Sequence, residues 1–275
     1  MLKRLLGYIA LLVLLSLVLI ACGGKDKKDD GGGDNNANDS TPAPEGTSPA
    51  GDDVLLGDAE ISGYPMTRLV RAAQDLTLIS YTVVQKDGYL YPMYLVRNDT
   101  GAVIENVSAI VTFLDAKNLR ITDDSFVSAY VNIPPDHLVP LMGSYPVPVD
   151  YDGLATILVP ESKETFDGYD PYFDAPVTTE LRPDTLEAHG TATNNSGKAL
   201  VQIAATFVLS DAAGNLIAVV PAVVTGLDEN GLWQPDTALD IVGPITAFAG
   251  DSLTNVAKTD LIVAGYERNP PSRQP

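Results

Sequence analysis

Two groups of aspartates are the residues in this sequence best suited to bind a cation. The first contains Asp150 and Asp152, and the second contains Asp167, Asp170 and Asp174. Both groups lie in stretches that contain Gly and Pro, which are typical of loops. Calcium takes roughly 6 to 8 oxygen ligands, so these carboxylates are candidate calcium ligands. Their spacing differs from that of an EF-hand loop, and the alternative is that they are solvated charges that keep an acidic protein soluble.

Other metal or catalytic chemistry has little support among the residue types. The 275 residues include one cysteine and two histidines, His137 and His189, which excludes a zinc site made of cysteines. The motifs Gly-x-Ser-x-Gly, His-Glu-x-x-His and Gly-x-Gly-x-x-Gly do not occur. We therefore expect no enzyme and no cofactor, and hydrolysis by loop carboxylates is the remaining catalytic alternative.

The charge balance bears on the class of partner. The sequence has 17 Lys+Arg against 36 Asp+Glu, a formal net charge of −19 and a pI near 4.2. Such a surface repels phosphates, so we expect no nucleic-acid partner. At 45% hydrophobic residues, the chain has enough apolar side chains for packed cores.

Tyrosines are concentrated in the middle of the chain and could recognise a ligand. Tyr89 and Tyr91 are two residues apart, which on a strand places both rings on one face. Two neighbouring rings can form a stacking platform for a sugar or for side chains of a partner. The alternative is that they are half-buried sheet residues, because aromatic residues favour strands without any ligand.

The single cysteine lies at the end of an export signal. Lys3 and Arg4 precede an apolar run over residues 5–20, which is the layout of a secretory signal. An uncleaved transmembrane anchor is the alternative, because the run is close to the length that a membrane helix needs. The segment Leu19-Ile20-Ala21-Cys22, however, resembles the lipobox of bacterial lipoproteins.

That resemblance implies that the chain is cut before Cys22 and that the Cys22 thiol carries diacylglycerol, with fatty acids such as palmitate. We therefore expect a signal peptide over residues 1–21 and an extracytoplasmic protein that contacts the membrane through acylated Cys22. Two or three acyl chains hold a protein on a bilayer where one chain does not.

The region after the cysteine is expected to be a tether. Residues 23–53 contain no Val, Ile, Leu, Met, Phe, Tyr or Trp, so residues 22–53 are expected to form a disordered, lipid-anchored linker. Residues 54–76 form a lead-in segment. Within it, Pro65 to Leu76 places apolar residues at helical spacing, which predicts one short helix that covers an end of the first domain or binds a partner.

The rest of the sequence contains an internal repeat. Residues from about 80 to 120 match those from about 176 to 217 at a shift of 96 to 97. Asn98-Asp99-Thr100-Gly101 falls on Asn194-Asn195-Ser196-Gly197, and Asn118-Leu119 is matched with Asn215-Leu216. Pro134-Pro135-Asp136 falls on Gln234-Pro235-Asp236 at a shift of 100. The drift in spacing indicates loop-length changes between duplicated units.

Each copy has the pattern of β-strands. Residues 107–113 and 203–209 alternate apolar positions with small or β-branched ones. The Asn-x-(Thr/Ser)-Gly segments tolerate positive φ, and they predict an antiparallel hairpin between Tyr89–Arg97 and Val103–Leu114. A second hairpin is expected around residues 195–198.

These motifs resemble a known domain family. Strand ends at Thr112–Asp115 and Phe207–Asp211, each preceded by Asn-x-(Thr/Ser)-Gly and followed by Pro-Asp, resemble the FxLYD-type domain. This family is an immunoglobulin-like β-sandwich of bacterial surface lipoproteins, and the resemblance covers most of residues 77–165 and 173–267. It implies an architecture and a cell-surface setting, and it brings no catalytic residues.

Together these observations predict a mainly β protein after the signal peptide and disordered linker. We expect two tandem immunoglobulin-like antiparallel β-sandwiches, over residues 77–165 and 166–267, and a disordered tail over residues 268–275. The expected function is that of a binding or structural module of the bacterial cell envelope, which contacts an unknown protein or envelope polymer through sheet edges and the tyrosine-rich first domain. Capture of a solute or polysaccharide by the Tyr89 and Tyr91 face is the alternative.

Overall fold

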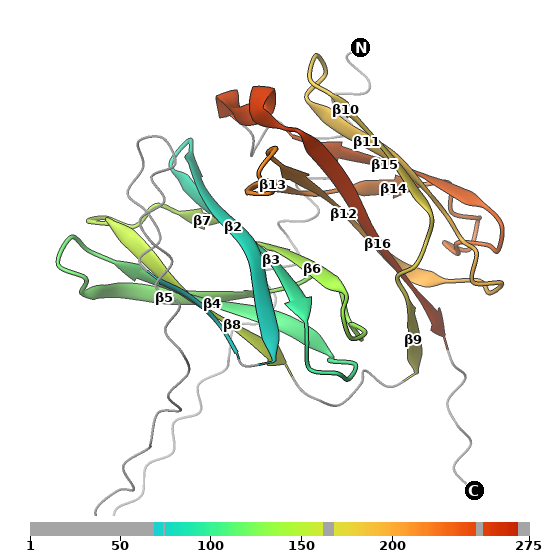
Figure 1. Cartoon of the computed structure of the whole chain (residues 1–275), viewed down its shortest axis with the longest axis horizontal. Helices are drawn as coiled ribbons and strands as arrows, with labels where there is room; N and C mark the ends of the chain where they lie inside the picture. Colours follow the sequence, from blue (N-terminus) through green and yellow to red (C-terminus); the bar gives the residue numbers. More distant parts are fainter. Residues whose placement is uncertain (1–68, 74, 162–167, 246–249, 269–275) are drawn as a thin grey trace, which may run out of the picture. The chain divides into compact units, whose positions relative to one another are not determined.

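Strands account for most of the described chain, and short turns connect them. The computed structural model describes residues 69–73, 75–161, 168–245 and 250–268. The predicted signal peptide and linker, Cys22 and Asp167 lie outside these residues, as do most of the lead-in segment and residues 269–275. The disordered tail was predicted to begin at Arg268, but Arg268 is the last residue of the final strand. Figure 1 shows the strands. Their bounds are β1 Leu69–Ala72, β2 Leu76–Lys86, β3 Tyr89–Asn98, β4 Asn106–Leu114, β5 Arg120–Val127, β6 Leu138–Met142, β7 Tyr145–Pro146, β8 Gly153–Glu161, β9 Tyr169–Tyr172, β10 Val177–Arg182, β11 Glu187–Thr193, β12 Val201–Ser210, β13 Leu216–Pro221, β14 Val223–Thr225, β15 Ala238–Pro244 and β16 Lys258–Arg268, with a 3₁₀ helix η1 at Gly250–Asn255.

The strands form four sheets, two in each half of the described chain. In the N-terminal half, residues 69–161, one sheet has the order β1-β8-β4-β5 (the β4 sheet) and the other has the order β2-β3-β6, with β7 also paired to β3 (the β3 sheet). In the C-terminal half, residues 168–268, the orders are β13-β12-β16-β9 (the β12 sheet) and β10-β11-β15-β14 (the β11 sheet). All these pairings are antiparallel except that of β1 with β8. The expectation of a mainly β, antiparallel sandwich fold is confirmed.

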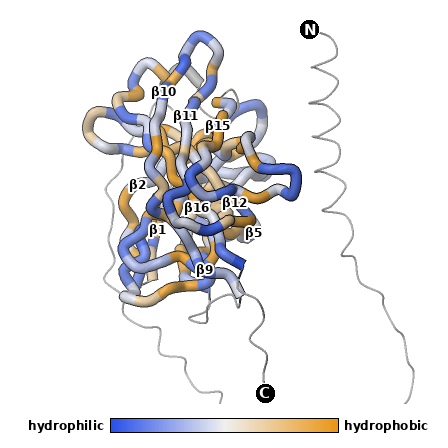
Figure 2. Tube along the Cα trace, turned by 90° about the vertical axis from the view of Figure 1, so that its right-hand side faces the viewer, coloured by the Kyte–Doolittle hydropathy of each residue, from blue (hydrophilic) through white to orange (hydrophobic). Residues whose placement is uncertain are grey.

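Alternation along β4 shows why this sequence builds a two-layer structure. Val107, Ala109, Val111 and Phe113 are buried, whereas Ile110 between them is exposed. Successive side chains of a strand point to opposite faces, so one face of the β4 sheet is turned to the core. Figure 2 shows this mixture of hydrophobic and hydrophilic residues along the strands.

The turn that ends β3 has the same hydrogen bonds as the turn that ends β11. Asn98 Oδ1 accepts from the backbone N–H of Thr100 at 3.1 Å, and Asn194 Oδ1 accepts from that of Ser196 at 3.0 Å. The Asn98 Nδ2 group donates to a carbonyl four residues later at 2.9 Å, and the Asn194 Nδ2 group does the same at 2.7 Å. The sequence repeat is therefore also a repeat of local structure.

The turn after β4 also corresponds to the turn after β12, and the shift between equivalent residues stays the same through the turn. The Oδ1 atoms of Asp115 and Asp211 each accept from the backbone N–H groups two and four residues later, at 2.8 to 2.9 Å. The residues with positive φ in these turns are Asn118 and Gly214. The shift is therefore still 96 here, and the match of Asn118-Leu119 with Asn215-Leu216 at a shift of 97 is wrong.

The predicted hairpins around the Asn-x-(Thr/Ser)-Gly segments are also wrong. Strand β3 pairs with β2 and β6, whereas β4 pairs with β5 and β8. The segment thus carries the chain from one sheet to the other instead of reversing it within a sheet. Asn98 explains this, because its Nδ2 also donates to the carbonyls of Ile133 and Pro134 at 2.9 and 3.0 Å, so the turn is held by a distant loop.

The predicted short helix over Pro65 to Leu76 does not form in the residues that the structure describes there. Leu69–Ala72 is strand β1, which runs parallel to β8 from Leu69 opposite Ala155 to Ala72 opposite Leu158. Val70 is buried in the N-terminal core. A short isolated helix is marginal, so pairing with a sheet edge outweighs its weak helical preference. The N-terminal half therefore begins at least eight residues before the predicted boundary at 77.

No helix of the described residues has the length and apolarity needed to cross a membrane.

Candidate functional site

The two tyrosines proposed as a binding face lie side by side at the start of β3. Their ring centroids are 6.4 Å apart and the ring planes are inclined by 30°. Tyr89 is 44% exposed, whereas Tyr91 is half-buried and packs against a hydrophobic cluster made mostly of C-terminal-half residues. The expectation that both rings share one face is confirmed, but only Tyr89 has a ring that is open to a ligand.

The reason Tyr91 is covered is that the outer face of the β3 sheet packs on the C-terminal half. Met93 and Leu95, which follow Tyr91 on the same face, belong to the same cluster as Val208 and Val219 of β12 and β13. The backbone N–H of Val219 donates to Met93 Sδ at 3.1 Å. The N–H of Leu216 donates to Ser80 Oγ at 2.8 Å. Strand β13 is an edge strand, so its outward N–H groups are satisfied by side chains of the N-terminal half.

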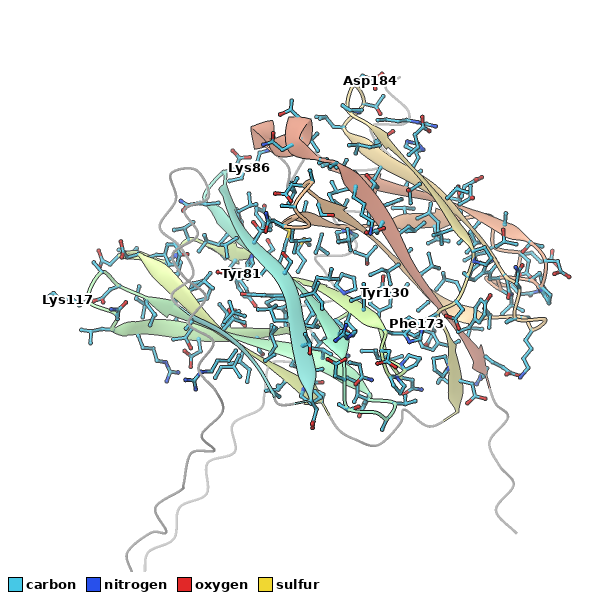
Figure 3. All side chains as sticks on the ribbon, viewed as in Figure 1. Tyr81, Lys86, Lys117, Tyr130, Phe173 and Asp184 are labelled. Atoms are coloured by element: carbon cyan, nitrogen blue, oxygen red, sulfur yellow. The ribbon has the colours of Figure 1, made fainter. Side chains whose placement is uncertain are left out.

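A second set of contacts joins the halves beside β16. Figure 3 labels Tyr130 and Phe173, whose ring centroids are 5.9 Å apart, and Phe173 also contacts Tyr266 edge-on at 6.4 Å. Hydrogen bonds accompany the rings. They run from Tyr130 Oη to the Ile262 carbonyl at 3.0 Å, from the Val131 N–H to Tyr266 Oη at 2.9 Å, and from Asn132 Nδ2 to the Tyr169 carbonyl at 2.6 Å.

Burial leaves these hydroxyls neutral. Desolvation raises the pKa of Tyr266 to about 12, although the hydrogen bond from Val131 acts in the opposite direction. Desolvation also raises the pKa of Tyr130. Neutral phenols can donate and accept hydrogen bonds without the cost of burying a charge, which suits them to a permanent contact.

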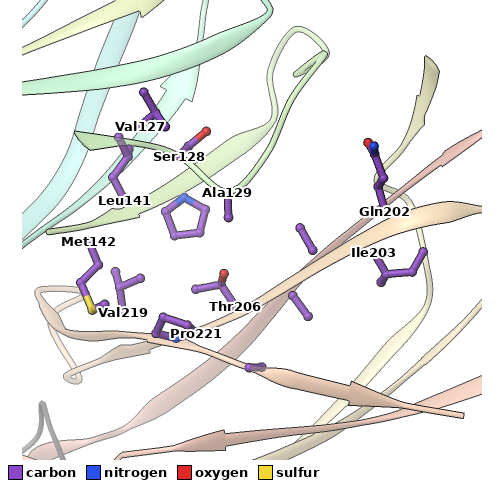
Figure 4. Close-up of a pocket in the computed structure, with 14 residues that line it drawn as sticks. Val127, Ser128, Ala129, Leu141, Met142, Gln202, Ile203, Thr206, Val219 and Pro221 are labelled. Carbon is purple, nitrogen blue, oxygen red and sulfur yellow. The ribbon is translucent and has the colours of Figure 1, made fainter. Parts of the chain in front are cut away.

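A groove runs between the two halves next to these contacts. Its volume is about 470 Å³. Figure 4 shows residues around Val127 and Leu141 on one side and residues of β12 and β13, including Thr206 and Pro221, on the other. The groove lining is mostly apolar, and none of the described side chains that line it is charged.

The structure describes four of the five candidate calcium ligands. Asp150 and Asp152 lie in the turn before β8, Asp170 lies on β9 and Asp174 lies after it. Asp174 Oδ1 is 3.5 Å from His137 Nε2, and its side chain is largely exposed. Within the described residues, no three His, Cys, Asp or Glu side chains are placed to hold a metal ion. Asp167 and the lipidation candidate Cys22 lie outside these residues.

Each of the two histidines contacts neighbouring side chains or backbone groups of the fold. His137 Nδ1 is 2.9 Å from the Pro135 carbonyl, and its ring contacts Phe173 edge-on at 5.2 Å. His189 Nε2 is 2.8 Å from Glu187 Oε2 on β11, and this hydrogen bond holds the pKa of Glu187 below its usual value.

Sequence reasoning missed the residues that join the halves. A signal was present in the repeat, because Met93 and His189 are equivalent positions at a shift of 96. An apolar residue in one copy thus replaces a polar residue in the other. The sequence matches no protein-family model and no curated protein at a significant level.

Proposed function

We propose that this chain is a lipid-anchored, extracytoplasmic module of the bacterial cell envelope, built of two tandem FxLYD-type immunoglobulin-like domains, which holds a binding surface away from the membrane. The observation that carries the proposal is the N-terminal sequence, in which two basic residues precede an apolar run and the motif Leu-Ile-Ala-Cys ends at Cys22. The next residues, 23–53, are polar and lack core-forming side chains. A flexible coil of this length has a mean end-to-end distance of roughly 30 Å.

The contacts between the halves support a structural role. Buried aromatic residues of the two halves pack together, and tyrosine hydroxyls of each half form hydrogen bonds with backbone groups of the other. A contact of this kind suits a protein that positions a partner, because a mobile junction adds an entropic cost to binding.

The lipid anchor is tested by replacing the only cysteine. Cys22→Ala is expected to abolish incorporation of a palmitate analogue and to leave residues 1–21 attached, because cleavage follows alkylation of the thiol. Metabolic labelling and intact-mass spectrometry measure both effects, and Ser40→Ala in the tether is the matched control, with normal labelling. A wild-type chain that retains residues 1–21 and an unmodified thiol would refute the anchor.

A second candidate function, capture of a polysaccharide or solute, is favoured by the exposed ring of Tyr89 stacked on Tyr91. Tyr89→Ala is then expected to weaken retention on cell-wall polysaccharide about tenfold, which corresponds to about 1.4 kcal/mol of stacking. Tyr89 is the suitable position because Tyr91 also supports the contact between halves. Val149→Ala, at a side chain that is 83% exposed, is the control in the binding assay. Equal retention of both variants would exclude this face.

A further inference from the structure

Strand β14 covers a sheet edge in the C-terminal half whose counterpart in the N-terminal half is open. In the β11 sheet, β14 pairs with β15, with Val223 opposite Val242 and Thr225 opposite Asp240. Strand β6 has the place of β15 in the β3 sheet, because β15 pairs with β11 and β6 with β3, the two strands that end at the repeated asparagine turns. In the described part of the chain, no strand pairs with the other edge of β6.

The residues of the N-terminal half that correspond to β14 are residues 127–129. The shift of 96 holds along β5 and β13, because Ile110 pairs with Ser125 where Thr206 pairs with Pro221. Continued by a few residues, the same shift places residues 127–129 on β14. The repeat therefore predicts that these residues cover the edge of β6.

Residues 127–129 remain with the β4 sheet instead. Val127 pairs with Ser108 on β4, and the Ser128 N–H donates to the Val107 carbonyl at 2.9 Å. Residues 127–129 form one wall of the groove of about 470 Å³, and residues 140–142 of β6 belong to another wall (Figure 4). The groove thus lies between the open edge and the residues whose counterparts cover that edge in the other half.

The open edge of β6 offers backbone hydrogen-bonding groups. The Gly143 N–H donates to the Pro92 carbonyl of β3 at 2.9 Å. Hydrogen-bonded pairs alternate along an antiparallel ladder, so every second residue before Gly143 also bonds to β3, and the residues between them turn their backbone groups outward. These outward residues are Leu138, Pro140 and Met142. Pro140 lacks an N–H, as suits an edge strand, and the Met142 N–H and the three carbonyls remain for a further strand.

The equivalent backbone groups of the C-terminal half are used by β14. Met142 and Pro140 correspond to Val242 and Asp240 at the shift of 100, and these are the β15 residues that lie opposite Val223 and Thr225. An extended peptide offers N–H and C=O groups at the repeat of a strand, whereas a sugar or a lipid chain does not. The repeat therefore selects a peptide strand as the occupant of this edge.

We propose that this groove binds an extended, uncharged segment of a partner protein, which pairs with β6 as an antiparallel strand in the place of β14. Main-chain hydrogen bonds supply the affinity, and apolar side chains at every second residue enter the groove. A charged side chain in the groove loses its hydration and gains no partner, because none of the described side chains that line it is charged. The inference names a site and a partner class for the proposed envelope module, and it rests on the proposed function for that setting.

Hydrogen exchange in the full chain, held in lipid nanodiscs, tests the open edge. The Met142 N–H is expected to exchange about tenfold faster than the Val242 N–H, which β14 protects. The probe is the acetylated and amidated peptide Ala-Val-Val-Thr-Gly-Leu, which has the sequence of residues 222–227. At about 5 mM, above the dissociation constant of roughly 1 mM expected for so short a strand, it should slow exchange at Met142 about fivefold and leave Val242 unchanged. Mass spectrometry with fragmentation to single residues measures both rates.

Two changes remove the added strand while the edge of β6 stays intact. A peptide methylated on the nitrogen of its first valine, which takes the place of Val223, cannot donate to the Met142 carbonyl and is expected to give no slowing. Ala129→Arg places a long side chain on the exposed wall of the groove and should also abolish the slowing. Ala213→Arg, at an exposed position in the turn between β12 and β13, is the matched control and should retain it.

Three results would overturn the proposed strand site. They are equal protection of the Met142 and Val242 N–H groups without peptide, which means that the edge is already covered, no slowing at Met142 with the peptide, and equal slowing with the methylated peptide. The intact mass of the same sample reports the acyl groups on Cys22. An acylated chain that the peptide does not protect refutes this inference alone, whereas a chain without acyl groups refutes the proposed anchor and leaves the peptide result to decide the strand site.

Discussion

Replacing Met93 with glutamate is expected to lower the free energy of unfolding by about 3–5 kcal/mol, the typical cost of an uncompensated buried charge. Met93 is completely buried on the outer face of the β3 sheet, and its sulfur accepts the hydrogen bond from the backbone N–H of Val219. A carboxylate at this position loses its hydration between the two halves, where hydrophobic side chains surround it. Packing of the halves should therefore fail before either sandwich unfolds.

Denaturant unfolding followed by circular dichroism measures this effect, and we expect one transition for the parent chain and two for the variant. His189→Glu is the matched control, because His189 occupies the equivalent position on β11 but is partly exposed. Its cost is expected to be about 1 kcal/mol, since water reaches this partly exposed position and Arg182 offsets the repulsion between the new carboxylate and those of Glu180 and Glu187. An unchanged midpoint for Met93→Glu would show that the contact between the halves contributes nothing to stability.

Replacing Asn98 with alanine is expected to cost about 3–5 kcal/mol, because several buried groups lose partners at once. The Asn98 amide nitrogen donates hydrogen bonds to the carbonyls of Ala102, Ile133 and Pro134. Its amide oxygen accepts from the N–H and the hydroxyl of Thr100. The carbonyls of Ile133 and Ala102 keep a second donor, the Ile104 N–H and the Thr100 hydroxyl, so the expected cost is the sum over the hydrogen bonds lost, at roughly 0.5–1.5 kcal/mol each. Asn98→Asp should be worse than Asn98→Ala, since a carboxylate would face these carbonyl oxygens.

The repeat provides two comparisons in the same thermal or chemical unfolding assay. Asn194→Ala should be destabilising to a similar degree, because Asn194 makes the corresponding bonds to the carbonyls of Lys198 and Trp233. Asn195→Ala, at the exposed neighbouring position, should change the free energy of unfolding by less than about 0.5 kcal/mol. If Asn98→Ala and Asn195→Ala are equally mild, these asparagines are ordinary turn residues and do not hold the two sheets together.

Local features of the fold could be predicted well from the sequence. Strand positions such as β4 and β12 follow from period-two alternation, which reflects the two faces of a strand and needs no distant information. The turns at Asn98 and Asn194 were also located correctly, because residues that tolerate positive φ are specific to turns. Which sheet the chain enters after each turn was not predictable. It depends on hydrogen bonds from Asn98 to the carbonyls of Ile133 and Pro134, and from Asn194 to that of Trp233, all of which are distant in the sequence.

The candidate site divides in the same way. Alternation alone placed Tyr89 and Tyr91 on one face, and the structure agrees. That Tyr91 is covered while Tyr89 stays open depends on strand β13, more than a hundred residues away, which packs beside it. The short helix was predicted where β1 forms for a similar reason, because a four-residue apolar segment fits either structure until a sheet edge is available to pair with it.

The amino-acid sequence by itself determined the acidic character of this protein, its strands and the repeated turn motifs, because these depend on residue type and near neighbours. Only the tertiary structure decided which apolar faces of the two halves meet and which face is left exposed. The alternation that marks a strand gives both of its faces the same weight, and burial of an outer face depends on what packs against it from elsewhere in the chain.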